Sequence, residues 1–425
     1  MSSGALVEAA LDIARGLVAS AEPSGEGLMW HADIVVGIEG DAPVIGHGDV
    51  GETLYDGTAG IAVGLAACAT SAPAPETAPL AEACLGAARH ALSGADVLLE
   101  AGRLGLYDGA TGVAWSAATA GRAVGDQALF DRAAALAQAV TTRLEAIPEG
   151  AELDLIGGLA GTLLGLQAVA SVLGVDAPSA ALRAGAQRLA AAAVPQAWGS
   201  AWATGGANPG GPPLLGLGHG AAGIALALAE IAGPGEDAAA VQASAQGLEY
   251  ERAWFDPDRV AWPDLRAVDA AGEATGSMTA WCHGAIGIGL SRLRLAQLTG
   301  SPAALAEASA ALQAARNLVV DIGTALRGGR TSDCTPCHGL AGVVELMLVA
   351  AQALEVPDHA RAARRVAGLM LEQRDAAAGA WPCGLAGAGE IPGLMVGTTG
   401  IALTLLRAAG ASDLPTPLLP GTSGW

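Results

Sequence analysis

One sequence element recurs seven times along the chain, and it limits the possible folds more than any other feature. Each copy consists of Gly-x-x-Gly followed by an apolar run. The copies are spaced by roughly 50–65 residues, further apart than common two-helix repeats, and they begin at Gly57, Gly109, Gly158, Gly220, Gly284, Gly339 and Gly397. One such element is a weak signal, but seven in phase predict a repetitive architecture.

A second helical pattern lies between successive glycine pairs. Segments 133–144 and 303–320 carry apolar residues at i, i+3, i+4 and i+7, as a helix with one wet face does. The segments that follow the glycine pairs, such as 61–67, are apolar on all sides, as buried helices are. This alternation predicts an all-α fold, a seven-fold α,α-barrel (toroid) with an inner and an outer layer of helices. Closing the ring would gather the N-termini of the inner helices at one end.

The composition fits such an architecture. Hydrophobic residues make up 52% of the chain and aromatic residues only 3%, which favours helices packed closely through small residues. The glycines would permit turns with positive φ and a close approach of backbones near the ring centre. The Pro-containing stretch 72–79 is short enough to be a loop, and no change in composition marks a boundary. We therefore expect a single domain over residues 1–425.

Net charge and the N-terminal sequence limit the partners. A formal net charge of −21 would repel phosphate backbones and anionic lipids, so we expect no nucleic-acid binding. The N-terminus lacks a basic segment followed by an apolar stretch, and the apolar run 214–231 is interrupted by His219 and Glu230. Six cysteines in such a chain indicate reduced thiols or metal ligands more than disulfides. These features predict a cytoplasmic protein with no membrane span.

Two consecutive repeats carry a Cys-His pair directly before their first glycine, namely Cys282-His283 and Cys337-His338. If the ring closes, Cys282, Cys337 and His338 can converge on one metal ion. Two thiolates and one imidazole suit Zn²⁺, and three protein ligands leave a fourth position open, as in catalytic zinc sites. The alternative is that these residues are buried cysteines and hydrogen-bonded histidines of a helical core.

The other cysteines are expected outside this site. Cys334 could be an extra ligand, but it precedes the position that the repeats share. Cys68 and Cys84 lie in helical patterns and are expected in the core. Cys383 is expected in a loop, and no role is assigned to it.

The order of these motifs resembles the lanthionine synthetase C-like family, in particular the cyclase portion of the bifunctional class II lanthipeptide synthetases. The matching segments run in family order over nearly the whole chain and are 53–61, 154–161, 219–224, 262–266, 281–289, 337–342 and 392–397. The resemblance implies a seven-fold α,α-barrel with Cys282, Cys337 and His338 as Zn²⁺ ligands. It also implies that His219 transfers a proton and that Asp154 lies beside it.

The function implied is that of a zinc-dependent carbon–sulfur bond-forming cyclase, a lanthionine synthetase. A cysteine thiolate would add to dehydroalanine or dehydrobutyrine in a dehydrated precursor peptide, giving (methyl)lanthionine thioether rings, and the enolate would take a proton at Cα. The 425 residues leave no room for the large dehydratase domain of the class II enzymes. We therefore expect a separate dehydratase if this is a stand-alone cyclase, and the alternative is a cyclase domain excised from a longer enzyme. Two alternatives are a glutathione-adding enzyme that acts on dehydroamino acids and a non-catalytic scaffold of a peptide-modifying complex.

Two positions depart from the family pattern. Stand-alone cyclases often have Tyr directly after the first zinc cysteine. Here that residue is His283, as in the class II type, which makes it a candidate second acid or hydrogen-bond donor. Some family members carry an Arg shortly before that cysteine, whereas Met278 stands four positions ahead here and the nearest basic candidate is Arg266. Asp56 and Asp108 precede glycine pairs and are interpreted as helix caps or turn formers.

Overall fold

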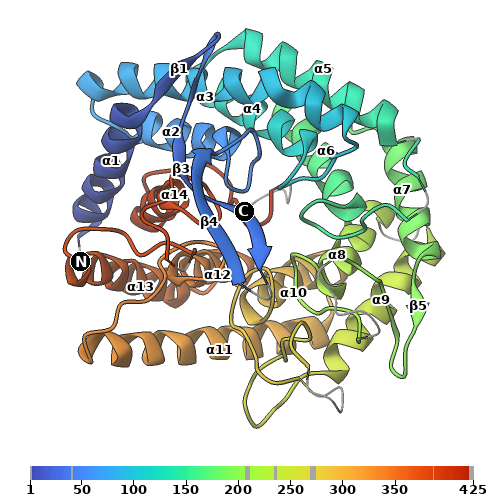
Figure 1. Cartoon of the computed structure of the whole chain (residues 1–425). Helices are drawn as coiled ribbons and strands as arrows, with labels where there is room; N and C mark the ends of the chain where they lie inside the picture. The colour runs from blue at the N-terminus through green and yellow to red at the C-terminus, as the bar shows by residue number, and fades with distance from the viewer. Residues whose placement is uncertain are drawn as a thin grey trace.

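Two concentric layers of α-helices make up most of the protein (Figure 1). The computed structural model describes residues 2–39, 42–144, 146–148, 150–205, 211–233, 237–268, 274–385 and 387–420. Within these ranges the inner helices are α2 (Thr58–Ser71), α4 (Ala110–Val124), α6 (Leu159–Leu173), α8 (Ala221–Ala232), α10 (Ala285–Thr299), α12 (Leu340–Ala353) and α14 (Thr398–Ala409). The outer helices are α1 (Ser3–Ser20), α3 (Ala74–Glu100), α5 (Gln127–Leu144), α7 (Ser179–Ala191), α9 (Ala238–Ala253), α11 (Pro302–Arg327) and α13 (Pro357–Ala376). The predicted all-α toroid is confirmed.

The two layers differ in how the side chains are buried. Inner helix α2 is buried on all sides from Thr58 to Ala69, because it packs against other helices in every direction. Outer helix α5 buries one stripe at helical spacing, which consists of Leu129, Ala133, Leu136, Val140 and Leu144. Among the described residues, no helix has both the length and the apolar character needed to cross a membrane.

The ring closes where the first and last helices meet. Helices α1 and α2 both pack against α14, and in Figure 1 the blue helix α1 lies near the red helix α14. Seven backbone N–H···O=C bonds join the segments that precede the inner helices, and each segment donates to the next one. They run from Tyr55 to Tyr107, Tyr107 to Ile156, Leu155 to Gly218, Gly218 to Cys282, Trp281 to Cys337, Cys337 to Met395 and Met395 back to Tyr55. We call this closed circle of hydrogen bonds the central ring.

The glycine pairs are needed mainly because the backbone is closely packed there, and less because of unusual backbone angles. The first glycine of each pair is the N-cap of an inner helix, and only Gly284 has a positive φ, 112°. The expectation of positive φ is therefore wrong for the other six, which are extended. The second glycine packs directly on a backbone carbonyl. A Cβ atom at Gly60 would lie 2.5 Å from the Leu54 oxygen, and one at Gly342 would lie 2.5 Å from the Pro336 oxygen.

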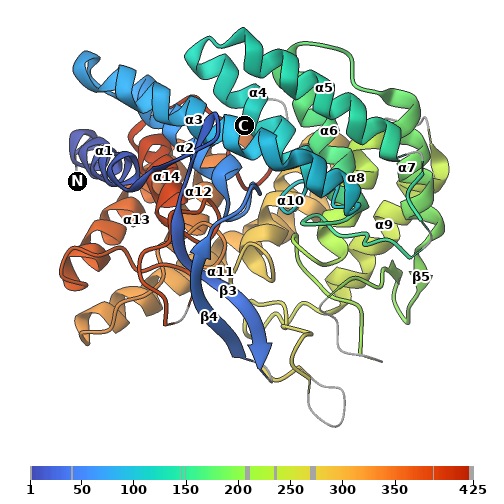
Figure 2. The same ribbon diagram turned by 45° about the horizontal axis from the view of Figure 1, so that its top comes forward.

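Short strands were not predicted from the sequence. Antiparallel pairs are formed by β1 (Glu22–Ser24) with β2 (Gly27–Met29), by β3 (His31–Glu39) with β4 (Ala42–Asp49), and by β5 (Val194–Pro195) with β6 (Ser200–Ala201). The β3–β4 hairpin stands out from the helices in Figure 2. The loop expected over residues 72–79 is also wrong, because α3 begins at Ala74. Pro75 lies in the first turn of that helix, where the missing N–H has no intrahelical partner to lose.

The segment that follows α14, described as far as Pro420, runs to the centre of the toroid. Leu418 and Leu419 are fully buried there. The Tyr107 hydroxyl donates to the Pro417 carbonyl at 2.8 Å, and the Trp281 indole donates to the Leu418 carbonyl at 2.9 Å. The tail is thus bound by residues at or next to the central ring.

Candidate functional site

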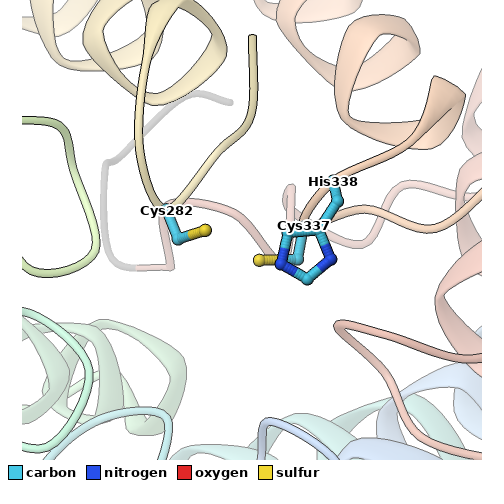
Figure 3. A group of neighbouring side chains, drawn as sticks. All are labelled: Cys282, Cys337 and His338. Atoms are coloured by element: carbon cyan, nitrogen blue, oxygen red, sulfur yellow. The ribbon is translucent and has the colours of Figure 1, made fainter. Parts of the chain in front are cut away.

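Cys282, Cys337 and His338 come together at the central ring (Figure 3). Their ligand atoms all lie within 4.8 Å of one another. Figure 3 shows the two sulfur atoms facing each other, with a ring nitrogen of His338 beside the Cys337 sulfur. The two cysteines occupy the same position before α10 and α12, and the Trp281 N–H bonds to the Cys337 carbonyl at 2.8 Å. The repeat therefore brings the predicted ligands together.

This donor set fits zinc. Two soft sulfur atoms and an imidazole are ligands that zinc prefers, and three protein donors leave a coordination position for a substrate atom. The Asp333 carboxylate lies 3.8 Å from His338 Nδ1, in the place where ligating histidines commonly have a carboxylate that orients the ring. Cys334 is buried but directs its thiol toward the Ser332 carbonyl, at 3.7 Å. Among the described residues it is not part of the three-residue group.

The two thiols differ in acidity. The hydrogen bond with Cys337 holds the pKa of the Cys282 thiol well below its usual range, although burial acts in the opposite direction and His338 adds to the lowering. Burial and the neighbouring Cys282 raise the pKa of Cys337. The Tyr55 hydroxyl lies 3.1 Å from the Cys337 sulfur and donates to it. The arrangement favours a thiolate at Cys282.

The partly exposed His219 and the buried Asp154 form a pair beside this group. His219 Nδ1 lies 2.5 Å from one oxygen of Asp154, and the other oxygen accepts the N–H groups of Gly157 and Gly158, both at 2.9 Å. Burial lowers the pKa of His219, but the hydrogen bond and charge of Asp154 outweigh it and raise the pKa above its ordinary value. The His219 ring also stacks on His283, with centroids 5.3 Å apart.

His283 has the opposite acidity to His219. Burial lowers the pKa of His283 to about 4, so its ring is neutral at neutral pH. Two stacked imidazoles with pKa values moved apart by their surroundings can serve different roles, one as an acid and one as a neutral hydrogen-bonding group.

A cavity of about 310 Å³ opens next to these histidines. Its charged and titratable lining residues are Asp108, Glu152, Asp154, His219, Arg266 and His283. Asp108 is therefore more than a turn former, since it faces this cavity and pairs with Arg103. Asp56 does act in a turn, because its carboxylate accepts the Thr53 hydroxyl at 2.7 Å.

Three residues near the site were missed from the sequence. Tyr55 holds the same position before its glycine pair as Cys282 and Cys337, so a comparison of that position across all repeats could have found it. Glu152 and Asp333 have no equivalent signal. Glu152 lines the cavity and accepts the Gly205 N–H at 2.7 Å, a contact with a loop that is distant in the sequence and leaves no sequence signal.

A closed double ring of helices, with two cysteines and a histidine gathered at the starts of its inner helices, defines a helical toroid with a candidate metal centre. A family model described as lanthionine synthetase C-like protein matches residues 48–419. The chain belongs to this lanthionine synthetase C-like family. The solved structure of nisin cyclase has the same fold, with a TM-score of 0.63 and 19% sequence identity over 88% of this chain and 93% of that chain. No curated protein sequence matches the chain.

Proposed function

We propose that this protein is a zinc-dependent lanthipeptide cyclase, which adds a cysteine thiolate to dehydroalanine or dehydrobutyrine to form a thioether ring. The observation that carries the proposal is the link between two groups of residues. His283, which directly follows Cys282 in the chain, stacks on His219, so the candidate metal ligands and the candidate acid are neighbours. Membership of the lanthionine synthetase C-like family supports the same reaction.

Cys282, Cys337 and His338 are the residues that would hold the zinc ion. A zinc ion bound there supplies a Lewis acid that keeps a substrate thiol ionised near neutral pH. Tyr55, which donates to the Cys337 sulfur, and Asp333, which faces His338 Nδ1, would orient two of the ligands.

His219 is the proposed proton donor. The substrate thiol first releases its proton to solvent. The thiolate sulfur then forms a bond to Cβ of the dehydro residue, and the π electron pair moves toward Cα and the carbonyl oxygen. His219 then gives its proton to Cα and is reprotonated from solvent. Asp154 keeps the imidazole oriented and raises its pKa, so that the protonated form persists near neutral pH. His283, which is neutral at that pH, is proposed as a hydrogen-bonding group and not a second acid.

The substrate of such a reaction is a precursor peptide that already contains dehydrated Ser or Thr residues. The residues described in the site supply a metal and a proton donor for addition, and we propose that a separate dehydratase provides the dehydrated peptide.

The test is direct. Zinc-loaded protein is incubated with synthetic peptides in which one dehydroalanine precedes one cysteine at different spacings, and the remaining thiol is alkylated and measured by mass spectrometry. We expect the thiol to disappear without a change in peptide mass. Glutathione is supplied in a parallel reaction, and a peptide that instead gains the mass of glutathione would favour the glutathione-adding alternative. Thiol loss at the rate of the protein-free control would contradict the proposal.

A further inference from the structure

Carboxylates outnumber the other charged side chains in the lining of the cavity beside His219. Three carboxylates face it, from Asp108, Glu152 and Asp154, and Arg266 is the one permanent cation among its described lining residues. Addition of a thiolate to a dehydro residue places a further negative charge on the substrate carbonyl oxygen before the proton arrives. An oxyanion that develops among carboxylates is destabilised unless a cation is held close to it.

The guanidinium of Arg266 is held in one orientation. Its Nε and Nη2 atoms bind the two carboxylate oxygens of Asp264 at 3.0 and 2.7 Å, and the Asp264 side chain is only 13% exposed. Nη2 also lies 2.8 Å from the sulfur of Met278. A two-point ion pair fixes the plane of a guanidinium as well as its position.

The backbone ties this arginine to the candidate metal ligands. The segment that carries Arg266 pairs with the segment that leads to Cys282, through a bridge between Pro263 and Ser277 and a hydrogen bond from the Asp264 N–H to the Gly276 carbonyl at 2.9 Å. Arg266 is therefore positioned by the same loop that ends at Cys282, and its guanidinium reaches the side chain that lies four positions before that cysteine.

We infer that Arg266 is a further catalytic residue, which stabilises the oxyanion formed when the thiolate adds to the dehydro residue, and that Asp264 positions it. This inference rests on the proposed cyclase function. Arg266, in the loop before Met278, would supply the positive charge that the neutral Met278 side chain cannot supply.

The first variant is Arg266→Gln, assayed with the dehydroalanine–cysteine peptides. Because one oxyanion donor is typically worth about 10²–10³ in kcat, we expect a loss of that order. Zinc content should stay at the parent value, since Arg266 is not one of the candidate ligands, and the protein should remain folded, with an unfolding midpoint lowered by the loss of the Asp264 partner. The matched control is Arg259→Gln in the same loop, whose side chain is 78% exposed and pairs with Asp256, and which should keep the parent rate.

Two rescue measurements separate catalysis from a structural effect. Moving the charge, in the double variant Arg266→Gln with Met278→Arg, should restore a large part of kcat, because the two side chains meet at 2.8 Å. Added methylguanidinium should raise the rate of Arg266→Ala in a saturable manner. Failure of both rescues, or a parent rate in Arg266→Gln, would overturn the role of Arg266 and leave the proposed function standing. A parent protein that does not consume the peptide thiol would instead contradict the proposed function itself.

Discussion

The two halves of the inner ring are built differently. Within the described residues, no ion pair joins α2, α4 and α6, which we call the apolar half. In the other half, which comprises α8, α10, α12 and α14 and which we call the charged half, ion pairs cross between inner helices. Arg294 of α10 binds Glu230 of α8 at 2.5 Å, and Arg407 of α14 binds Glu345 of α12 at 2.9 Å.

The candidate metal ligands all lie directly before α10 and α12, two helices of the charged half. Apolar contacts between helices have little directional preference, whereas a buried ion pair favours one arrangement of the two helices that carry it. Arg292 of α10 also binds Glu251 of α9 at 2.8 Å, and Glu251 accepts the Gly216 N–H at 2.7 Å, in the segment that leads to His219. We interpret these ion pairs as contacts that hold in place the helices that carry the candidate site.

The largest effect should come from His219→Ala in the charged half. Loss of a general acid costs about 10²–10⁴ in rate, so kcat should fall by that factor while zinc content is unchanged. The matched change in the apolar half is Asp56→Asn, at the equivalent position before its glycine pair, and it should leave the rate near that of the parent. The assay is thiol consumption in the dehydroalanine–cysteine peptide. Equal rates in the two variants would remove His219 from the mechanism.

Breaking an ion pair of the charged half should cost more than breaking a neutral contact of the apolar half. Glu345→Ala leaves Arg407 buried without its partner and should destabilise the protein by about 3–5 kcal/mol. Ser116→Ala removes a neutral bond from α4 to the Ala59 carbonyl of α2 and should cost about 0.5–1.5 kcal/mol. Denaturant unfolding measures both. A Glu345→Ala protein as stable as the Ser116→Ala protein would mean that the charges do not fix the helices.

Both halves should respond alike to substitution of the second glycine of a pair. A Cβ atom at Gly112 would meet the Leu106 carbonyl and lie 2.9 Å from Leu54 Cβ, and one at Gly287 would meet the Trp281 carbonyl. Gly→Ala at either position should destabilise by about 1–3 kcal/mol. In outer helix α11, a Cβ at Gly323 would meet only the Arg327 side chain, at 3.6 Å, so Gly323→Ala should stabilise by about 0.5–1 kcal/mol. The same sign of change at all three positions would refute the close-packing explanation.

The smallest expected effect is a shift in the pH dependence of the rate, and it concerns the Asp154–His219 pair, which joins the two halves. Asp154 precedes the last helix of the apolar half and raises the pKa of His219 in the charged half. The acid must be protonated, so the rate falls as pH rises through this pKa. Asp154→Asn removes the carboxylate that counteracts the lowering of the His219 pKa by burial. The alkaline limb of the pH–rate profile should therefore move to lower pH. Asp108→Asn, which faces the same cavity but pairs with Arg103, should leave the limb in place.

The fold could be predicted from the sequence because its repeat is visible in the glycines. Seven pairs in phase gave the number of inner helices, and the Cys-His pairs before Gly284 and Gly339 then fell at equivalent places around the ring. The strands β3 and β4 were missed because they lie before the first glycine pair and belong to no repeat. The start of α3 was missed because Pro75 was taken as a loop signal, although the first turn of a helix tolerates it.

The surroundings of the site were less predictable. The pairing of His219 with Asp154 was implied by the family resemblance, and the structure places the two in contact. The stacking of His283 on His219 and the position of Arg266 depend on how a long loop folds back on itself, through backbone bonds that leave no periodic signal. Chain segments of this kind can be placed only by their tertiary contacts.

The central claim is that the inner-helix starts of the charged half form a zinc centre. The most direct test is the zinc content per chain of the purified protein, measured beside Cys337→Ala and the control Cys334→Ala, which changes a buried thiol outside the three-residue group. We predict about one zinc in the parent and in Cys334→Ala, and almost none in Cys337→Ala. A folded parent that contains no zinc and takes up none, or a Cys337→Ala protein that retains it fully, would contradict the account.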